Sequence, residues 1–89
     1  MKETVKVLAK TGIYANVASL LVETAGRFES EVKLVYRGKY VNAKSILGVM
    51  SLGIQSGAIF ELEVEGIDKL ACLSCIEKEL ANNISKIEA

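Results

Sequence analysis

Hydrophobic and polar residues alternate over three stretches of the chain, residues 4–7, 32–37 and 60–65. A period of two predicts strands that are buried on one face and exposed on the other. The third stretch is the clearest, because glutamate occupies every second position between its apolar residues. These carboxylates, Glu61, Glu63 and Glu65, are most simply the solvated face of a sheet, since no companion base or metal ligand is placed to use them. A fourth, shorter strand is expected at residues 40–42, after a tight turn at residues 37–39.

Apolar residues recur at helical spacing over two longer stretches. The first predicts a helix over residues 15–26, which Gly26 can end. The second predicts a long amphipathic helix near the C-terminus. Its apolar stripe consists of Leu70, Leu73, Ile76, Leu80, Ile84 and Ile87.

Residues 45–54, between the third and last strands, carry six apolar side chains and two glycines. As a short helix, this segment can turn only one stripe toward the sheet, which leaves the remaining apolar side chains near solvent. Such a surplus on a small domain indicates a contact surface. The alternative is that Gly48 and Gly53 allow close packing, so that the whole segment is buried. The residue pattern leaves both interpretations open.

The elements follow the order βαββαβα, with one-sided strands and helices available to cover their apolar face. This order predicts an α+β open-faced sandwich, in which a four-stranded antiparallel sheet is covered on one face by three helices. The chain has 89 residues, no proline and no low-complexity stretch. We therefore expect a single domain over residues 1–89.

Composition narrows the classes of partner. Lys+Arg and Asp+Glu both number 11, and no cluster of basic residues offers a footprint for nucleic acid or an anionic membrane. No apolar run approaches the roughly 20 residues that span a bilayer. The N-terminus has no signal-peptide pattern, so we expect a cytoplasmic protein. Hydrophobic residues make up 51% of the chain, enough for a core without metal or disulfide support.

Cys72 and Cys75 have the CxxC spacing of redox and zinc sites. However, they fall inside the predicted C-terminal helix, and the chain has no second pair and no histidine to complete four ligands. Cys75 adjoins Ile76 on the apolar stripe, which favours core packing over redox or metal chemistry. We expect neither a metal site nor a cofactor.

Residues 42–53, followed by Gly57, Ala58 and a strand, closely resemble the regulatory-serine region of HPr. HPr is the small phosphocarrier of the bacterial sugar phosphotransferase system. Weaker matches at residues 10–13 and 36–39 stand in the right order, so the resemblance covers essentially the full chain. It implies the same open-faced sandwich and the same βαββαβα order.

The chain departs from the family at the catalytic loop. The family pattern there is Gly, an aliphatic residue, His, Ala, Arg, Pro, Ala, whereas residues 12–18 have Tyr14 at the histidine position, Asn16 at the arginine position and Val17 at the proline position. An imidazole titrates near neutrality and suits phosphoryl relay, while a phenol titrates near pH ~10 and is a poorer nucleophile at neutral pH. The lost guanidinium would have paired with phosphoryl oxygens. The resemblance therefore implies a divergent, Crh-like member with no catalytic residue and no histidine phosphocarrier activity.

Ser45 corresponds to the serine that a dedicated ATP-dependent kinase phosphorylates in the Gram-positive branch of the family. The phosphorylated product there binds the catabolite-control repressor, and the residues matching that recognition patch are Ser45, Ile46, Leu47 and Met50. A phosphate at a helix N-terminus is electrostatically favourable. The alternative is that Ser45 only caps the helix.

Together these features predict a non-enzymatic regulatory or adaptor phosphoprotein of carbon catabolite control, which binds protein partners through Tyr14, Ala15, Asn16 and residues 45–54. By resemblance, the partners are the HPr kinase/phosphorylase, the catabolite-control repressor or phosphotransferase-system proteins. Two alternatives stay open. Tyr14 could be an unorthodox phosphoryl acceptor, or the fold could be a binding module reused in another pathway with both family sites idle.

Overall fold

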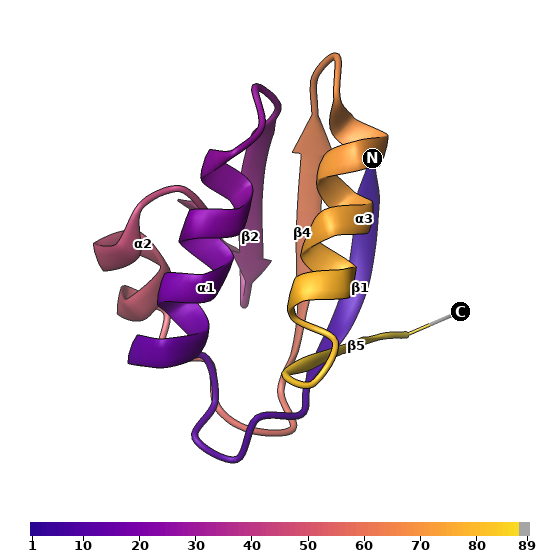
Figure 1. Ribbon diagram of the computed structural model, residues 1–89. Helices are drawn as coiled ribbons and strands as arrows, with labels where there is room; N and C mark the ends of the chain where they lie inside the picture. The colour runs from indigo at the N-terminus through magenta and orange to yellow at the C-terminus, as the bar shows by residue number, and fades with distance from the viewer. Residues whose placement is uncertain (88–89) are drawn as a thin grey trace.

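The computed structural model describes residues 1–87, which form one sheet and three helices (Figure 1). In chain order the elements are β1 (Lys2–Val7), α1 (Ala15–Gly26), β2 (Glu31–Tyr36), β3 (Lys39–Asn42), α2 (Ile46–Ser51), β4 (Ile59–Glu65), α3 (Lys69–Glu79) and β5 (Ile84–Lys86).

The sheet has the strand order β3-β2-β4-β1-β5, and every neighbouring pair is antiparallel. Leu34 of β2 lies opposite Leu62 of β4, and Lys33 lies opposite Glu63. Cross-strand partners share a face, so the two central strands separate an apolar face from a charged one. The helices cover the apolar face, with α1 and α3 side by side in front of β2 and β4 (Figure 1). The predicted α+β open-faced sandwich is confirmed.

The number of strands was predicted wrongly, because the last element expected as helix is partly a strand. Helix α3 ends at Glu79, and Leu80 follows as its C-cap. The next residues include Asn82 and Asn83, whose side chains compete with helical backbone hydrogen bonding. The chain then extends beside β1, where Ile84 pairs with Val7. The sheet therefore has five strands.

The apolar stripe predicted for the C-terminal helix is correct in its middle and wrong at both ends. Leu73, Ile76 and Leu80 are buried, whereas Leu70 in the first turn is 66% exposed. The backbone amide of Ile87 donates a 2.8 Å hydrogen bond to the carbonyl oxygen of Thr4, so this residue continues alongside β1 and is not helical.

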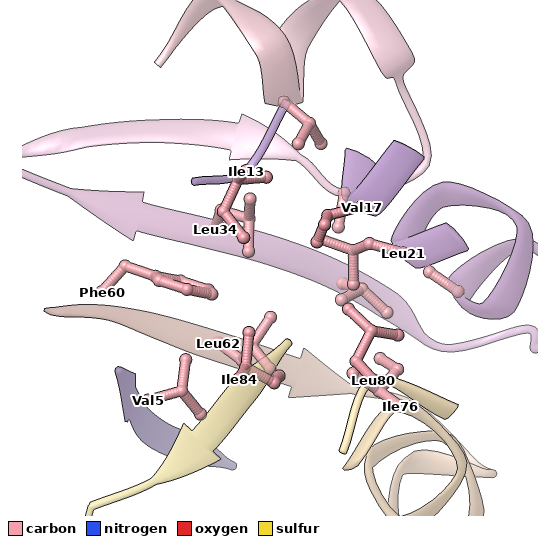
Figure 2. Close-up of a cluster of buried hydrophobic side chains, with 14 of the residues drawn as sticks. Val5, Ile13, Val17, Leu21, Leu34, Phe60, Leu62, Ile76, Leu80 and Ile84 are labelled. Carbon is pink, nitrogen blue, oxygen red and sulfur yellow. The ribbon is translucent and has the colours of Figure 1, made fainter. Parts of the chain in front are cut away.

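The core lies between the sheet and the two longer helices. Figure 2 shows Leu21 of α1 near Ile76 and Leu80 of the α3 region, with Leu62 of β4 to the left of Ile76 and Leu80. All four side chains are at most 1% exposed. Burial of apolar surface on this scale is the main stabilising contribution to such a domain, and it holds α1 at a fixed position on the sheet.

Asp68, the N-cap residue of α3, connects the start of that helix to the loop that follows α1. Its carboxylate accepts hydrogen bonds from the Ser30 hydroxyl and from the backbone amides of Glu29 and Ser30, the two amide bonds both at 2.9 Å. These bonds, with the largest contribution from the Ser30 side chain, hold the pKa of Asp68 below its ordinary value. The loop that follows α1 is thereby tied to the start of α3.

Among the helices within residues 1–87, none is both long and apolar enough to cross a membrane.

Candidate functional site

The first half of the site is the start of α1, at the lower end of the molecule in Figure 1. Tyr14 is the N-cap residue, and its side chain makes no capping hydrogen bond and is 64% exposed. Ala15 and Asn16, the first two helical residues, are also exposed. A tyrosine at this place presents a phenol to solvent and leaves the first amide groups of the helix without a side-chain acceptor.

The backbone just before α1 is fixed against the segment that follows α2. Gly12 has a φ of +75°, and a Cβ built on it would lie 2.4 Å from the carbonyl oxygen of Ile54. The amide of Ile13 donates a 2.8 Å hydrogen bond to that same oxygen, and the Ile13 side chain is 2% exposed. Only glycine fits both the close approach and the positive φ. This contact places the start of α1 beside the end of α2.

The second half of the site is the start of α2, where Ser45 is the N-cap. Its Oγ accepts a hydrogen bond of 3.2 Å from the backbone amide of Gly48. Ser45 is half-buried, and in the part of the chain that the structure describes its hydroxyl donates to no acceptor. Ser45 therefore caps α2, and the proton of its hydroxyl is unused; whether capping is its only role is a separate question from this geometry.

Helix α2 presents apolar side chains to solvent directly beside Ser45. Leu47 is 80% exposed and Ile46 is 37% exposed, while Met50 is half-buried against the core. Among the six residues of α2, Val49 alone is fully buried. The interpretation in which the whole segment is buried is therefore wrong, and an exposed apolar surface remains. We call Tyr14, Ala15, Asn16, Ser45, Ile46, Leu47 and Met50 the α1–α2 surface.

Both cysteines belong to α3 and are not part of this surface. Cys72 is completely buried, and burial, with a smaller contribution from the charge of Asp68, raises the pKa of its thiol. Cys75, which the sequence placed on the apolar stripe, is only half-buried, and Nη1 of Arg27 lies 3.9 Å from its Sγ. Over residues 1–87, no three side chains of ligand type lie close enough together to hold a metal ion.

Two features of this end of the molecule were not recognised from the sequence. Gly12 was noted only as part of a family pattern, although its close contact with Ile54 positions α1. The turn at Arg37, Gly38 and Lys39 was interpreted as a connection alone, yet its cations line a pocket beside the end of α2. The presence of two basic residues in one turn was the signal in the sequence that could have indicated this pocket.

Comparison with known proteins gives one consistent result. Residues 1–82 match the family model PTS-HPr, described as the PTS HPr component phosphorylation site. The chain is 44% identical over 84 residues to the phosphocarrier protein HPr of Treponema pallidum (strain Nichols), which covers 94% of this chain and 96% of the relative.

Solved structures of the same kind share the fold. The crystal structure of HPr-C-His from Thermoanaerobacter tengcongensis matches with a TM-score of 0.83 and 36% identity, covering 91% of this chain and 96% of the other. The crystal structure of Crh, the catabolite repression protein of Bacillus subtilis, matches with a TM-score of 0.72 and 41% identity, covering 82% of this chain and 84% of the other.

Proposed function

Because the chain belongs to the HPr family, we propose that it is a cytoplasmic, non-enzymatic regulatory or adaptor protein of the phosphotransferase system and carbon catabolite control. In this proposal it binds protein partners through the α1–α2 surface, and phosphorylation of Ser45 switches that binding. The observation that carries the proposal is the position of Ser45 at the N-cap of α2, directly beside the exposed Leu47.

The composition argues against the relay chemistry of the family. The chain contains no histidine, and the family's histidine position falls on Tyr14 by the resemblance of residues 12–18. A phenol forms a more stable phosphoester than an imidazole does, so rapid transfer of the phosphoryl group onward is disfavoured. Asn16 at the arginine position offers no cation to the phosphoryl group. In this proposal the α1 end of the surface only contacts protein partners and carries no phosphoryl group.

The α2 end supplies the groups that a phosphorylation switch needs. The Ser45 hydroxyl is half-buried but donates to no acceptor within residues 1–87, so a kinase would break only the weak capping bond from Gly48. Phosphorylation would place about two negative charges beside an exposed leucine. Apolar contact and local charge would together distinguish the modified form from the unmodified form, as the resemblance to Crh and HPr suggests for the catabolite-control repressor.

The affinity of the catabolite-control repressor for the two forms of the protein tests this function. We expect the form phosphorylated on Ser45 to bind at least about tenfold more tightly than the unmodified form, since hydrogen bonds to a charged group contribute about 1.5–3 kcal/mol. The phosphorylated Leu47→Ser variant should lose most of that affinity. Equal affinities of the two forms would contradict the switch.

A second function deserves a test because Tyr14 is exposed and its side chain makes no capping bond. Tyr14 would then be a phosphoryl acceptor in a transferase chain. Incubation with phosphorylated enzyme I should in that case transfer phosphate to the wild-type protein but not to Tyr14→Phe. The absence of any transfer to the wild type would exclude this function.

A further inference from the structure

A polar pocket of about 200 Å³ lies between the β2–β3 hairpin and the segment that follows α2. Its walls are formed by Tyr36, Arg37, Lys39, Leu52, Gly53 and Gln55. Two of these residues carry positive charge and none carries negative charge. The pocket is therefore a local concentration of positive charge on a chain whose net charge is zero.

The charged and amide side chains that line this pocket form no hydrogen bond or salt bridge within the described residues. Within residues 1–87, Arg37 and Lys39 form no salt bridge, and the side-chain amide of Gln55 forms no hydrogen bond. The Arg37 guanidinium lies over the Tyr36 ring, 5.1 Å from its centroid. This cation–π contact favours a guanidinium position over the ring and leaves the N–H groups free to donate.

The backbone conformation on both sides of the pocket determines its shape. Arg37 and Gly38 both have positive φ, 49° and 78°, so the hairpin turns tightly and both cations lie close together in the chain. Gly53 has a φ of +59°, and the space that its Cβ would occupy is open. The volume is several times the roughly 30 Å³ that a water molecule occupies in the liquid, so a phosphate group with a few further atoms fits.

From this arrangement we propose that Arg37, Lys39 and Gln55 bind the phosphate group of a phosphate monoester. A guanidinium donates paired hydrogen bonds to two oxygens of such a group, and an ammonium adds a point charge, so a dianion matches both cations. A larger depression of about 250 Å³ near β3 is a weaker candidate, because Glu31 lines it together with its lysines.

The pocket is distinct from Ser45, so this inference does not depend on phosphorylation of that serine. It nevertheless adjoins the α1–α2 surface, because a Cβ on Gly12 would lie 2.9 Å from the Cα of Gln55. The ester could be a free small molecule or a phosphorylated side chain of a bound protein.

Chemical-shift titration of the ¹⁵N-labelled protein tests the proposal, with glycerol 3-phosphate and a blocked phosphoserine tripeptide as the two probes. We expect saturable shifts at the amides of Arg37, Lys39, Gly53 and Gln55. Tighter binding of glycerol 3-phosphate would identify a free ester as the ligand, and tighter binding of the peptide would identify a phosphorylated protein. Both outcomes support the site.

Matched variants separate local recognition from net charge. Arg37→Gln should weaken binding about tenfold or more, as expected for the loss of hydrogen bonds to a charged group. Lys33→Gln removes one positive charge from β2, the strand that precedes this turn, at a position outside the pocket, and should leave the affinity unchanged. Shifts that do not saturate, or equal weakening by the two substitutions, would overturn the proposal.

Discussion

The backbone amide of Ile13 donates a 2.8 Å hydrogen bond to the carbonyl oxygen of Ile54. These residues are far apart in the chain, and each lies at the border of one half of the α1–α2 surface: Ile13 precedes Tyr14, and Ile54 follows α2. Both side chains are 2% exposed. The bond therefore fixes the start of α1 and the segment that follows α2 relative to each other.

Substitution of Gly12 tests this junction. Gly12→Ala should destabilise the protein by about 2–3 kcal/mol or more, because the new Cβ meets the Ile54 carbonyl oxygen at 2.4 Å in addition to the cost of a positive φ. Gly57→Ala is the matched control, since Gly57 also has a positive φ, +83°, but open space around its Cβ. It should cost about 1–2 kcal/mol. Urea unfolding measures both, and equal costs would show that the close approach has no energetic weight.

Ser45 should contribute to stability as well as to regulation. Ser45→Ala removes the acceptor for the Gly48 amide and should lower the free energy of unfolding by about 0.5–2 kcal/mol, whereas Ser45→Asp retains a capping oxygen and should cost less. Ser74→Ala, at an exposed serine of α3 whose hydroxyl forms no hydrogen bond within residues 1–87, is the control and should change stability by only about 0.5 kcal/mol. Thermal unfolding of the three variants shows whether the Ser45 side chain stabilises the helix. An unchanged free energy of unfolding in Ser45→Ala would argue against the cap.

The lowered pKa of Asp68 implies that the stability of the protein depends on pH in the acidic range. Its pKa is lowered in the folded protein from an ordinary value of 3.8, so its stabilising contribution is fully present above that value and is lost as the pH falls through the folded pKa. Asp68→Asn should therefore be less stable than the wild type at about pH 7, and the difference should shrink below about pH 4. Urea unfolding at several pH values measures this difference. A constant difference across that range would mean that the carboxylate charge is not responsible.

Leu70 and Ile84 lie on the same predicted helical stripe but differ in the structure. Ile84 is 4% exposed in β5, whereas Leu70 is 66% exposed in α3. Ile84→Ala should cost about 2–5 kcal/mol, and Leu70→Ala only about 0.5 kcal/mol. Chemical denaturation measures both. Similar costs would favour the continuous helix that the sequence pattern suggests.

That pair of residues also shows how far the sequence alone leads. The alternation of residues 32–37 and 60–65 predicted the central strands correctly, because a one-residue shift would move their apolar side chains to the charged face. The spacing of Leu80 and Ile84 fits a helix equally well, but the pattern cannot show that β1 has a free edge for Ile84 to join. Pairing between distant strands decides that element, and local periodicity contains no information about it.

The candidate site also has features that the sequence predicted and features that it did not. The surplus of apolar residues near Leu47 indicated a contact surface, and the structure leaves that side chain 80% exposed. The junction at Gly12 and the pocket at Arg37 were not foreseen, because both depend on the path of residues 52–55 between α2 and β4. The roles of Ser45 and Tyr14 remain predictions from the resemblance and from their positions.

Intact-mass measurement after exposure to two phosphoryl donors tests the central proposal most directly. The wild-type protein is incubated separately with HPr kinase and ATP, and with enzyme I and phosphoenolpyruvate. We expect the mass of one phosphoryl group to be added by the kinase alone, to be absent in Ser45→Ala and to be retained in Ser51→Ala. A phosphoryl group acquired from enzyme I, or no gain from the kinase, would contradict a regulatory protein that is switched at Ser45 and has no relay activity.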